Sequence, residues 1–187
     1  ARVFLENENR SINLLPSIES LNDLLNSMPD SNPGTTLTIS SDDVIVYIYT
    51  SGTTGFPKAT AVTQKRWLIL GNLFPLYGGI TPENIQYMVL PLYHNSGFDI
   101  GFSSLIVSGG TMVLRRKFSA RAFWDEVRKY GVSIFIYVGE LCRYVYNQPP
   151  RPNDTDNPLH FVTGNGMRGD LMEPFRKRFN IEYIYEV

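Results

Sequence analysis

A ten-residue stretch gathers glycines, hydroxyl side chains and a lysine in one place. It reads Tyr49-Thr50-Ser51-Gly52-Thr53-Thr54-Gly55-Phe56-Pro57-Lys58. Glycine lets backbone N–H groups approach a ligand closely, and the hydroxyl groups add further hydrogen-bond donors. The lysine ammonium adds a mobile point charge. Together these groups predict a loop that binds the phosphates of a nucleotide.

The same stretch could instead be a Walker A motif or a simple surface turn. The Walker A motif places Gly-Lys-Ser or Gly-Lys-Thr at its end, whereas here Pro57 precedes Lys58 and Ala59 follows it, so the match fails. A surface turn rich in Ser, Thr and Gly has the same composition. The defined order of residues over the whole stretch favours phosphate binding over a simple turn.

A histidine follows a predicted strand in Pro91-Leu92-Tyr93-His94-Asn95-Ser96-Gly97. A lone histidine is most often structural or simply exposed. A histidine close to a bound carboxylate can also stabilise its charge. The residues alone leave both roles open for His94.

A third candidate is the glycine-rich segment Gly164-Asn165-Gly166-Met167-Arg168-Gly169. It satisfies G-x-G-x-x-G between a predicted strand and a predicted helix, and Glu186 follows about twenty positions later, as in dinucleotide-binding folds. A dinucleotide fingerprint normally opens its domain, however, and here more than 150 residues precede it. A dinucleotide-binding oxidoreductase is therefore a minor alternative.

Strand patterns alternate with helical patterns along the chain. Strands are predicted at 44–49, 59–62, 86–90, 111–114, 132–138, 159–163 and 181–186, of which 44–49 and 86–90 are expected to be buried. Helices are predicted at 17–28, 63–77, 96–108, from a Ser119 cap to Gly131, 140–147 and 169–179, with a surface loop at 151–158. This alternation predicts an α/β fold with layered, largely parallel sheets flanked by helices.

The predicted topology places the candidate loops relative to one another. Ligands of parallel sheets bind outside the carboxyl ends of the strands. If the strands that precede them run parallel, the loops at 50–58, 91–96 and 164–168 lie at one edge. The apolar residues that follow the histidine, among them Phe98 and Phe102, fit an acyl tunnel and an ordinary core equally well.

The composition narrows the classes of function. The chain has 187 residues and a formal net charge of -1, which argues against nucleic acid as a partner. Its single cysteine, Cys142, cannot form a disulfide within the chain and is expected to be a buried apolar residue. No apolar stretch is long enough to span a membrane, and no zinc-type spacing or G-x-S-x-G elbow occurs.

The ten-residue stretch resembles the phosphate-loop signature of the adenylate-forming superfamily, which includes acyl-CoA synthetases and luciferases. The segment Tyr137-Val138-Gly139-Glu140-Leu141-Cys142-Arg143-Tyr144 is similar to one in the branch of fatty-acid-transport proteins and very-long-chain acyl-CoA synthetases. On its own, the Glu140 and Arg143 pair is an ordinary surface ion pair. The resemblance implies part of the large N-terminal domain, with residues 1–43 as a partial N-terminal segment with a linker and 44–187 as a C-terminally truncated AMP-binding domain.

The resemblance also assigns roles to the candidates. The loop after the predicted strand at 86–90 matches a family loop whose histidine, here His94, lies near the acyl carboxylate and is the catalytic candidate. The glycine segment, here Gly164, Asn165 and Gly166, borders the adenine and acyl pockets. ATP phosphates would be bound by Thr50, Ser51, Gly52, Thr53, Thr54, Gly55 and Lys58. No metal ligand is expected within this chain, and the implied cofactors are ATP, Mg²⁺ and coenzyme A.

The function implied is that of a fragment of a long-chain or very-long-chain fatty acid–CoA ligase. Such an enzyme converts a fatty acid and ATP to an acyl-adenylate and then to acyl-CoA, in a process coupled in this branch to fatty acid uptake. The family implies membrane association, at the endoplasmic reticulum, peroxisome or plasma membrane. The 187 residues alone are expected to be inactive and poorly stable. A non-catalytic nucleotide- or acyl-binding module is the alternative.

Overall fold

The computed structural model describes residues 3–5, 18–50 and 58–187, in two units, Ala1–Ile39 and Ser40–Val187. In the first unit, β1 (Val3–Leu5) pairs in parallel with β2 (Ile18–Ser20), and α1 (Leu21–Ser27) and a 3-10 turn (Gly34–Thr38) follow. The Ser20 hydroxyl caps α1 by accepting a 3.2 Å hydrogen bond from the Asp23 N–H. The predicted helix therefore starts later than expected, because residues 18–20 pair as a strand.

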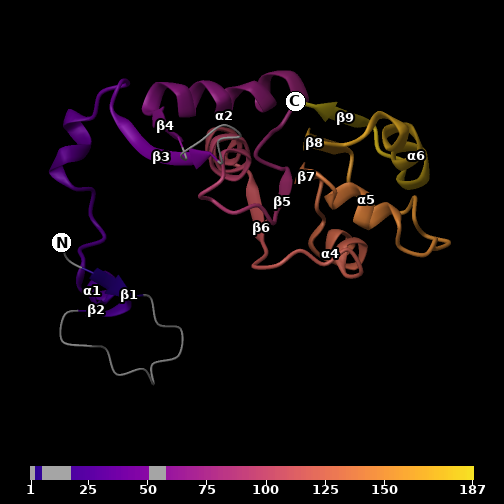
Figure 1. The fold of residues 1–187 in the computed structure, drawn as a ribbon, viewed down its shortest axis with the longest axis horizontal. Coiled ribbons are helices and arrows are strands. Elements are labelled where there is room, and N and C mark those ends of the chain that lie inside the picture. The colour runs from indigo at the N-terminus through magenta and orange to yellow at the C-terminus, as the bar shows by residue number, and fades with distance from the viewer. Residues whose placement is uncertain (1–2, 6–17, 51–57) are drawn as a thin grey trace. The chain divides into compact units, whose positions relative to one another are not determined.

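The second unit is built on a five-stranded sheet in which every neighbouring pair is parallel, as predicted (Figure 1). The strands are β5 (Ile85–Met88), β6 (Thr111–Leu114), β7 (Ile134–Val138), β8 (Phe161–Asn165) and β9 (Tyr183–Glu186), in the order β6-β5-β7-β8-β9. The connection from each strand to the next along the chain contains a helix, as parallel pairing requires.

The central strand β7 is buried on both faces, which explains its unbroken apolar sequence. Phe135 and Tyr137 belong to the core on one face, and Ile134 and Ile136 belong to the core on the other. The first core packs α4 (Phe123–Tyr130), α5 (Leu141–Tyr146) and α6 (Gly169–Phe179) against the sheet (Figure 1). Cys142 is completely buried in this core, as expected.

The other face of the sheet carries a helical pair. A π-helix (Ser96–Phe102) runs directly into α3 (Ser103–Ser108), so the predicted helix at 96–108 forms with an irregular first half. The long helix α2 (Gln64–Gly78) packs on this pair at Gly71, where an added Cβ would lie 2.9 Å from the Ser103 carbonyl oxygen. A glycine is needed at this position for the close approach of the two helices.

The strand before the phosphate loop differs from the prediction. Strand β3 (Val44–Thr50) pairs only with β4 (Lys58–Thr63), antiparallel, in a two-stranded sheet separate from the parallel one. Of its apolar side chains, Ile48 is buried, whereas Tyr47 and Tyr49 are 59% and 72% exposed. The prediction of a buried strand was wrong. An apolar run indicates that a strand can be buried, but it does not reveal which segment would cover the strand.

The helix predicted from a Ser119 cap also starts later than expected. The Ser119 hydroxyl accepts a 3.3 Å hydrogen bond from the Ala122 N–H, so it caps a turn that precedes α4. The helix itself spans Phe123–Tyr130. Gly131, with a left-handed backbone (φ 65°), terminates it as predicted.

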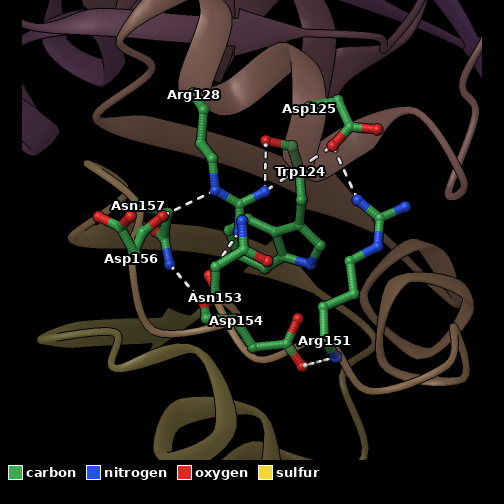
Figure 2. A network of polar contacts seen from close by, with 8 residues as sticks. All are labelled: Trp124, Asp125, Arg128, Arg151, Asn153, Asp154, Asp156 and Asn157. Carbon is green, nitrogen blue, oxygen red and sulfur yellow. Dashed lines mark hydrogen bonds and ion pairs between the residues drawn. The ribbon is translucent and has the colours of Figure 1, made fainter.

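The proline-rich loop at 148–158 joins α5 to the amino end of β8 and is tied to α4 by arginine side chains (Figure 2). The Arg128 guanidinium donates to the carbonyl oxygens of Asp156 at 2.7 Å, Asn153 at 2.6 Å and Trp124 at 3.1 Å. Arg151 forms a 2.7 Å ion pair with Asp125. The predicted surface loop is therefore held in place by hydrogen bonds to its own backbone.

Candidate functional site

Two of the three predicted loops lie at the carboxyl edge of the parallel sheet. The segment 91–95 follows β5 and the segment 164–168 includes the end of β8 and its exit, and both strands run in the same direction. The strands on either side of the third loop, β3 and β4, form a separate antiparallel sheet. The condition for the expectation, parallel strands before all three loops, therefore fails for the phosphate loop, and the placement of residues 51–57 stays a prediction.

The glycines of the 164–168 loop are required by close backbone contacts. Gly164 pairs with Tyr137 in the sheet, and a Cβ there would overlap the Tyr137 carbonyl oxygen. Gly166 has φ +89°, and a Cβ on it would lie 2.9 Å from the Cα of Gly139. The Gly139 N–H donates a 2.7 Å hydrogen bond to the Asn165 carbonyl oxygen. The end of β8 is thus pressed against the end of β7.

The carboxylate of Glu186, at the end of β9, binds this loop. It accepts hydrogen bonds from the backbone N–H groups of Gly166 and of Met167, the latter at 3.0 Å, and from the hydroxyl of Tyr137. Burial first, and then the hydrogen bond to Glu186, raises the pKa of Tyr137 above its usual range, so the hydroxyl stays a donor. These contacts explain why a carboxylate stands about twenty positions after the glycine segment without a ribose as its ligand, which argues against the dinucleotide hypothesis.

His94 lies in an exposed loop whose backbone is closed by hydrogen bonds. Its N–H donates to the Pro91 carbonyl oxygen at 3.0 Å, and its own carbonyl accepts from the N–H groups of Gly97 and Phe98. The ring Nδ1 accepts a 3.2 Å hydrogen bond from the Ser96 N–H. An Nδ1 that accepts carries no proton, so this bond selects the neutral tautomer protonated at Nε2. The exposed Nε2–H can then donate to a carboxylate.

A buried carboxylate lies behind the histidine loop. Asp99, in the π-helix, is fully buried, and its Oδ2 lies 3.3 Å from the guanidinium of Arg66 on α2. The contact is an ion pair without good hydrogen-bond geometry, since neither Asp99 oxygen has a hydrogen-bond partner. The same guanidinium donates to the Asn95 Oδ1 at 3.3 Å. Burial raises the pKa of Asp99 and the charge of Arg66 opposes that shift.

The next residue of α2, Trp67, also contacts the segment that follows His94. Its Nε1–H donates to the Phe98 carbonyl oxygen at 3.1 Å, and its ring lies 5.7 Å from that of Phe98 and 6.1 Å from that of Phe102. Phe98 and Phe102 therefore pack between two helices. These contacts account for the two rings as ordinary packing, and the acyl-tunnel role remains a prediction.

Helix α2 connects this packing to the phosphate loop. The Thr63 hydroxyl caps α2, as predicted, by accepting a 3.2 Å hydrogen bond from the Arg66 N–H. Thr63 ends β4, and at the other end of β4 Lys58 lies opposite Thr50 in the hairpin register. The predicted phosphate ligands Ser51, Gly52, Thr53, Thr54 and Gly55 lie outside the described residues.

A cavity of about 410 Å³ opens between α2 and the ends of β8 and β9. Its walls are mainly apolar and come from α2, β8 and β9, through Leu73, Tyr77, Gly78, Phe161, Tyr185, Glu186 and Val187. Sequence reasoning did not select Tyr77 or Phe161 as site residues, because neither belongs to a motif. Their separation of more than eighty positions in the chain gives no local signal that they would meet.

The described residues contain neither a metal centre nor a membrane span. Among them, no group of three or more His, Cys, Asp or Glu side chains is placed to hold a metal ion. Within the same residues, no helix has the length and apolar character needed to cross a bilayer. The predicted surface ion pair between Glu140 and Arg143 does form at the start of α5.

Nearly the whole chain matches one protein-family model, described as AMP-binding enzyme, over residues 6–187. The chain belongs to the AMP-binding enzyme family. The predicted membership of the adenylate-forming superfamily is thereby confirmed, and the G-x-G-x-x-G segment is part of this family's domain.

This member of the AMP-binding enzyme family is similar to fatty acid ligases and transport proteins. It is 37% identical over 174 residues to the medium/long-chain-fatty-acid–CoA ligase FadD6 of Mycobacterium tuberculosis. The aligned region covers 91% of this chain and 29% of that protein. It is 48% identical over 141 residues to long-chain fatty acid transport protein 2 of Rattus norvegicus, covering 75% and 23% respectively. The chain thus spans less than a third of the length of these relatives.

Solved structures of adenylate-forming enzymes share the fold. The inhibitor-bound N-terminal domain of FACL13 from Mycobacterium tuberculosis superposes with a TM-score of 0.74 at 20% identity, over 88% of this chain and 41% of that one. The AMP complex of o-succinylbenzoate coenzyme A synthetase from Bacillus subtilis gives 0.72 at 22% identity, over 91% and 35%. The predicted α/β architecture of a large N-terminal domain is confirmed.

Proposed function

We propose that this chain is part of a long-chain or very-long-chain fatty acid–CoA ligase. The observation that carries the proposal is the phosphate-loop sequence between Thr50 and Lys58, set in a hairpin whose second strand leads into the helix that supports the His94 loop. Two relatives support the choice of substrate, because one is named as a medium/long-chain-fatty-acid–CoA ligase and the other as a long-chain fatty acid transport protein.

The first chemical step is adenylation of the fatty acid. A carboxylate oxygen attacks the α-phosphorus of ATP, the bond to the β-phosphate breaks, and pyrophosphate leaves. The backbone and hydroxyl groups at 50–55 and the Lys58 ammonium hold the departing phosphates, so the enzyme contributes mainly positioning and charge stabilisation. The Nε2–H of His94 donates to the carboxylate and orients it.

The second step transfers the acyl group to coenzyme A. The thiolate sulphur attacks the acyl carbon, a thioester forms, and AMP leaves with the oxygen that it gained in the first step. In our proposal the adenine and the acyl chain lie against Gly164, Asn165 and Gly166 and enter the apolar cavity beside Glu186. Magnesium would enter with the phosphates of ATP and neutralise their charge.

We further propose that the complete enzyme works at a membrane and couples fatty acid activation to uptake. Support comes from the relatives named as fatty acid transport proteins, of rat, human and mouse. Its partners would be fatty acid, ATP and coenzyme A, without nucleic acid. A non-catalytic nucleotide- or acyl-binding module is the second candidate, because the phosphate-loop sequence at 50–58 accounts for binding of a nucleotide without requiring catalysis.

Nucleotide binding tests the proposal on the chain itself. Titration of the ¹⁵N-labelled chain with AMP should shift the amide signals of Asn165 and Gly166, and addition of NAD should not reproduce those shifts. A piece of a ligase and a binding module both bind AMP, and fatty-acid-dependent pyrophosphate exchange in a complete enzyme that contains this chain separates them. Absence of any AMP-dependent shift in a folded sample would refute both proposals.

A further inference from the structure

One carboxylate gathers hydrogen-bond donors from two other strands at the carboxyl edge of the sheet. Tyr137 lies near the end of β7, and Gly166 and Met167 follow β8. All three residues donate hydrogen bonds to Glu186 at the end of β9. We propose that Glu186 is a positioning residue, whose carboxylate holds the 164–167 loop in the shape that receives the nucleotide. The consequence for nucleotide binding rests on the proposed function, whereas the holding of the loop does not.

The chemistry of the three donors explains why a carboxylate is needed. An ionised carboxylate has two oxygens and only accepts, and hydrogen bonds to it are about twice as strong as those between neutral groups. A glutamine would turn its NH₂ group either toward the two N–H groups or toward the Tyr137 hydroxyl, which would then have to accept instead of donate, and in both orientations the negative charge is lost. Glu186 is therefore matched to its neighbours by charge and not only by size.

The backbone around the loop depends on the same anchor. Gly166 has a left-handed backbone, which glycine adopts without strain, and a Cβ on it would lie 2.9 Å from the Cα of Gly139. On the far side of Glu186, the N–H of Val187 donates a 2.7 Å hydrogen bond to the Gly164 carbonyl oxygen. The end of β9 thus holds the loop both by its side chain and by its backbone.

The anchored loop leaves one polar group available to a ligand. In the part of the chain that the structure describes, the side-chain amide of Asn165 makes no hydrogen bond. The backbone carbonyl oxygen of the same residue accepts a hydrogen bond from the Gly139 N–H. An amide offers both donors and an acceptor, as recognition of a purine edge requires. The backbone hydrogen bonds of residues 164–167 point into the protein, so Asn165 is the group that the positioned loop presents.

Amide hydrogen exchange tests whether Glu186 holds the loop. In Glu186→Gln, the amide protons of Gly166 and Met167 should exchange about tenfold faster than in the parent chain, the change expected for the loss of one hydrogen bond to a charged acceptor. The amide of Val162 in the middle of β8 should not change. Glu182→Gln, which removes an exposed charge in the same segment, serves as the matched control.

Affinity for AMP tests the positioning role. The Glu186→Gln chain should bind AMP about tenfold more weakly, and Tyr137→Phe, which removes one of the three donors, should lie between it and the parent. Unchanged exchange of Gly166 and Met167, or unchanged AMP affinity in Glu186→Gln, would overturn the inference. If the parent chain binds no AMP, the proposed function fails, and the exchange rates still decide whether Glu186 holds the loop.

Discussion

The carboxylate of Asp99 is fully buried, with its Oδ2 3.3 Å from the guanidinium of Arg66. A charge in this position is tolerated only while its partner stays in place. Arg66 also donates to Asn95, the neighbour of His94. The ion pair therefore joins the helix that follows the phosphate hairpin to the loop that carries the candidate catalytic histidine.

Removal of Arg66 should destabilise the chain. We expect Arg66→Met to lower the free energy of unfolding by about 2 kcal/mol, because Asp99 would be left buried without its counter-charge. The double variant Arg66→Met/Asp99→Leu should recover most of that loss, since an apolar pair of similar volume removes the desolvation cost. Urea denaturation of the parent, both single variants and the double variant measures the coupling. Additive effects would contradict the pairing.

The same pair predicts a pH dependence. Because burial raises the pKa of Asp99 in the folded chain, the folded state binds its proton more readily than the unfolded state. Asp99 therefore destabilises folding most at neutral pH, and this cost falls as the pH is lowered through the folded pKa toward the unfolded value of 3.8. The stability advantage of Asp99→Asn over the parent should shrink between pH 7 and pH 4.5. An advantage that is constant or grows would contradict the assignment.

The state of His94 is open to direct observation. The hydrogen bond from the Ser96 N–H to Nδ1 predicts the neutral Nε2–H tautomer, which long-range ¹H–¹⁵N spectra of the ring identify. His160, which is in a different environment, provides the internal comparison. A ring protonated at Nδ1 at neutral pH would show that the hydrogen bond from the Ser96 N–H is absent and that His94 does not present Nε2–H.

The arginine that ties the 148–158 loop should matter for stability and not for the site. Arg128→Ala removes three hydrogen bonds to backbone carbonyls (Figure 2), so we expect a loss of about 2 kcal/mol. The control Arg176→Ala breaks only an exposed pair with Glu173 at 3.5 Å and should cost less than about 0.5 kcal/mol. AMP affinity should stay the same in both. A weaker AMP affinity in Arg128→Ala would link this loop to the site.

Local signals in the sequence predicted the parallel sheet and its helices well. Helix α6 was predicted with its observed bounds, Gly169–Phe179. The π-helix at Ser96–Phe102 could not be predicted, since seven residues are too few for the apolar pattern to distinguish its period from that of an α-helix. The partners of β3 were likewise hidden, because its pattern does not reveal which strand it joins.

The site was only partly visible in the sequence for the same reason. His94, Gly164 and Gly166 belong to short motifs and were therefore selected as candidates. Glu186 attracted notice only as a possible ribose ligand, because its spacing fitted a dinucleotide fold. Its contact with Tyr137 spans 49 positions, and no local pattern records a contact at that range. The pairing of Arg66 with Asp99 was missed for the same reason.

The most direct test of the account is catalysis in a chimera. Residues 44–187 would replace the matching segment of the Mycobacterium tuberculosis ligase FadD6, and ATP–pyrophosphate exchange would be measured with and without a long-chain fatty acid. The account predicts exchange that requires the fatty acid and is reduced at least about tenfold by His94→Ala, the loss of one hydrogen bond to a charged group. A folded chimera that binds AMP but shows no fatty-acid-dependent exchange would contradict the ligase proposal.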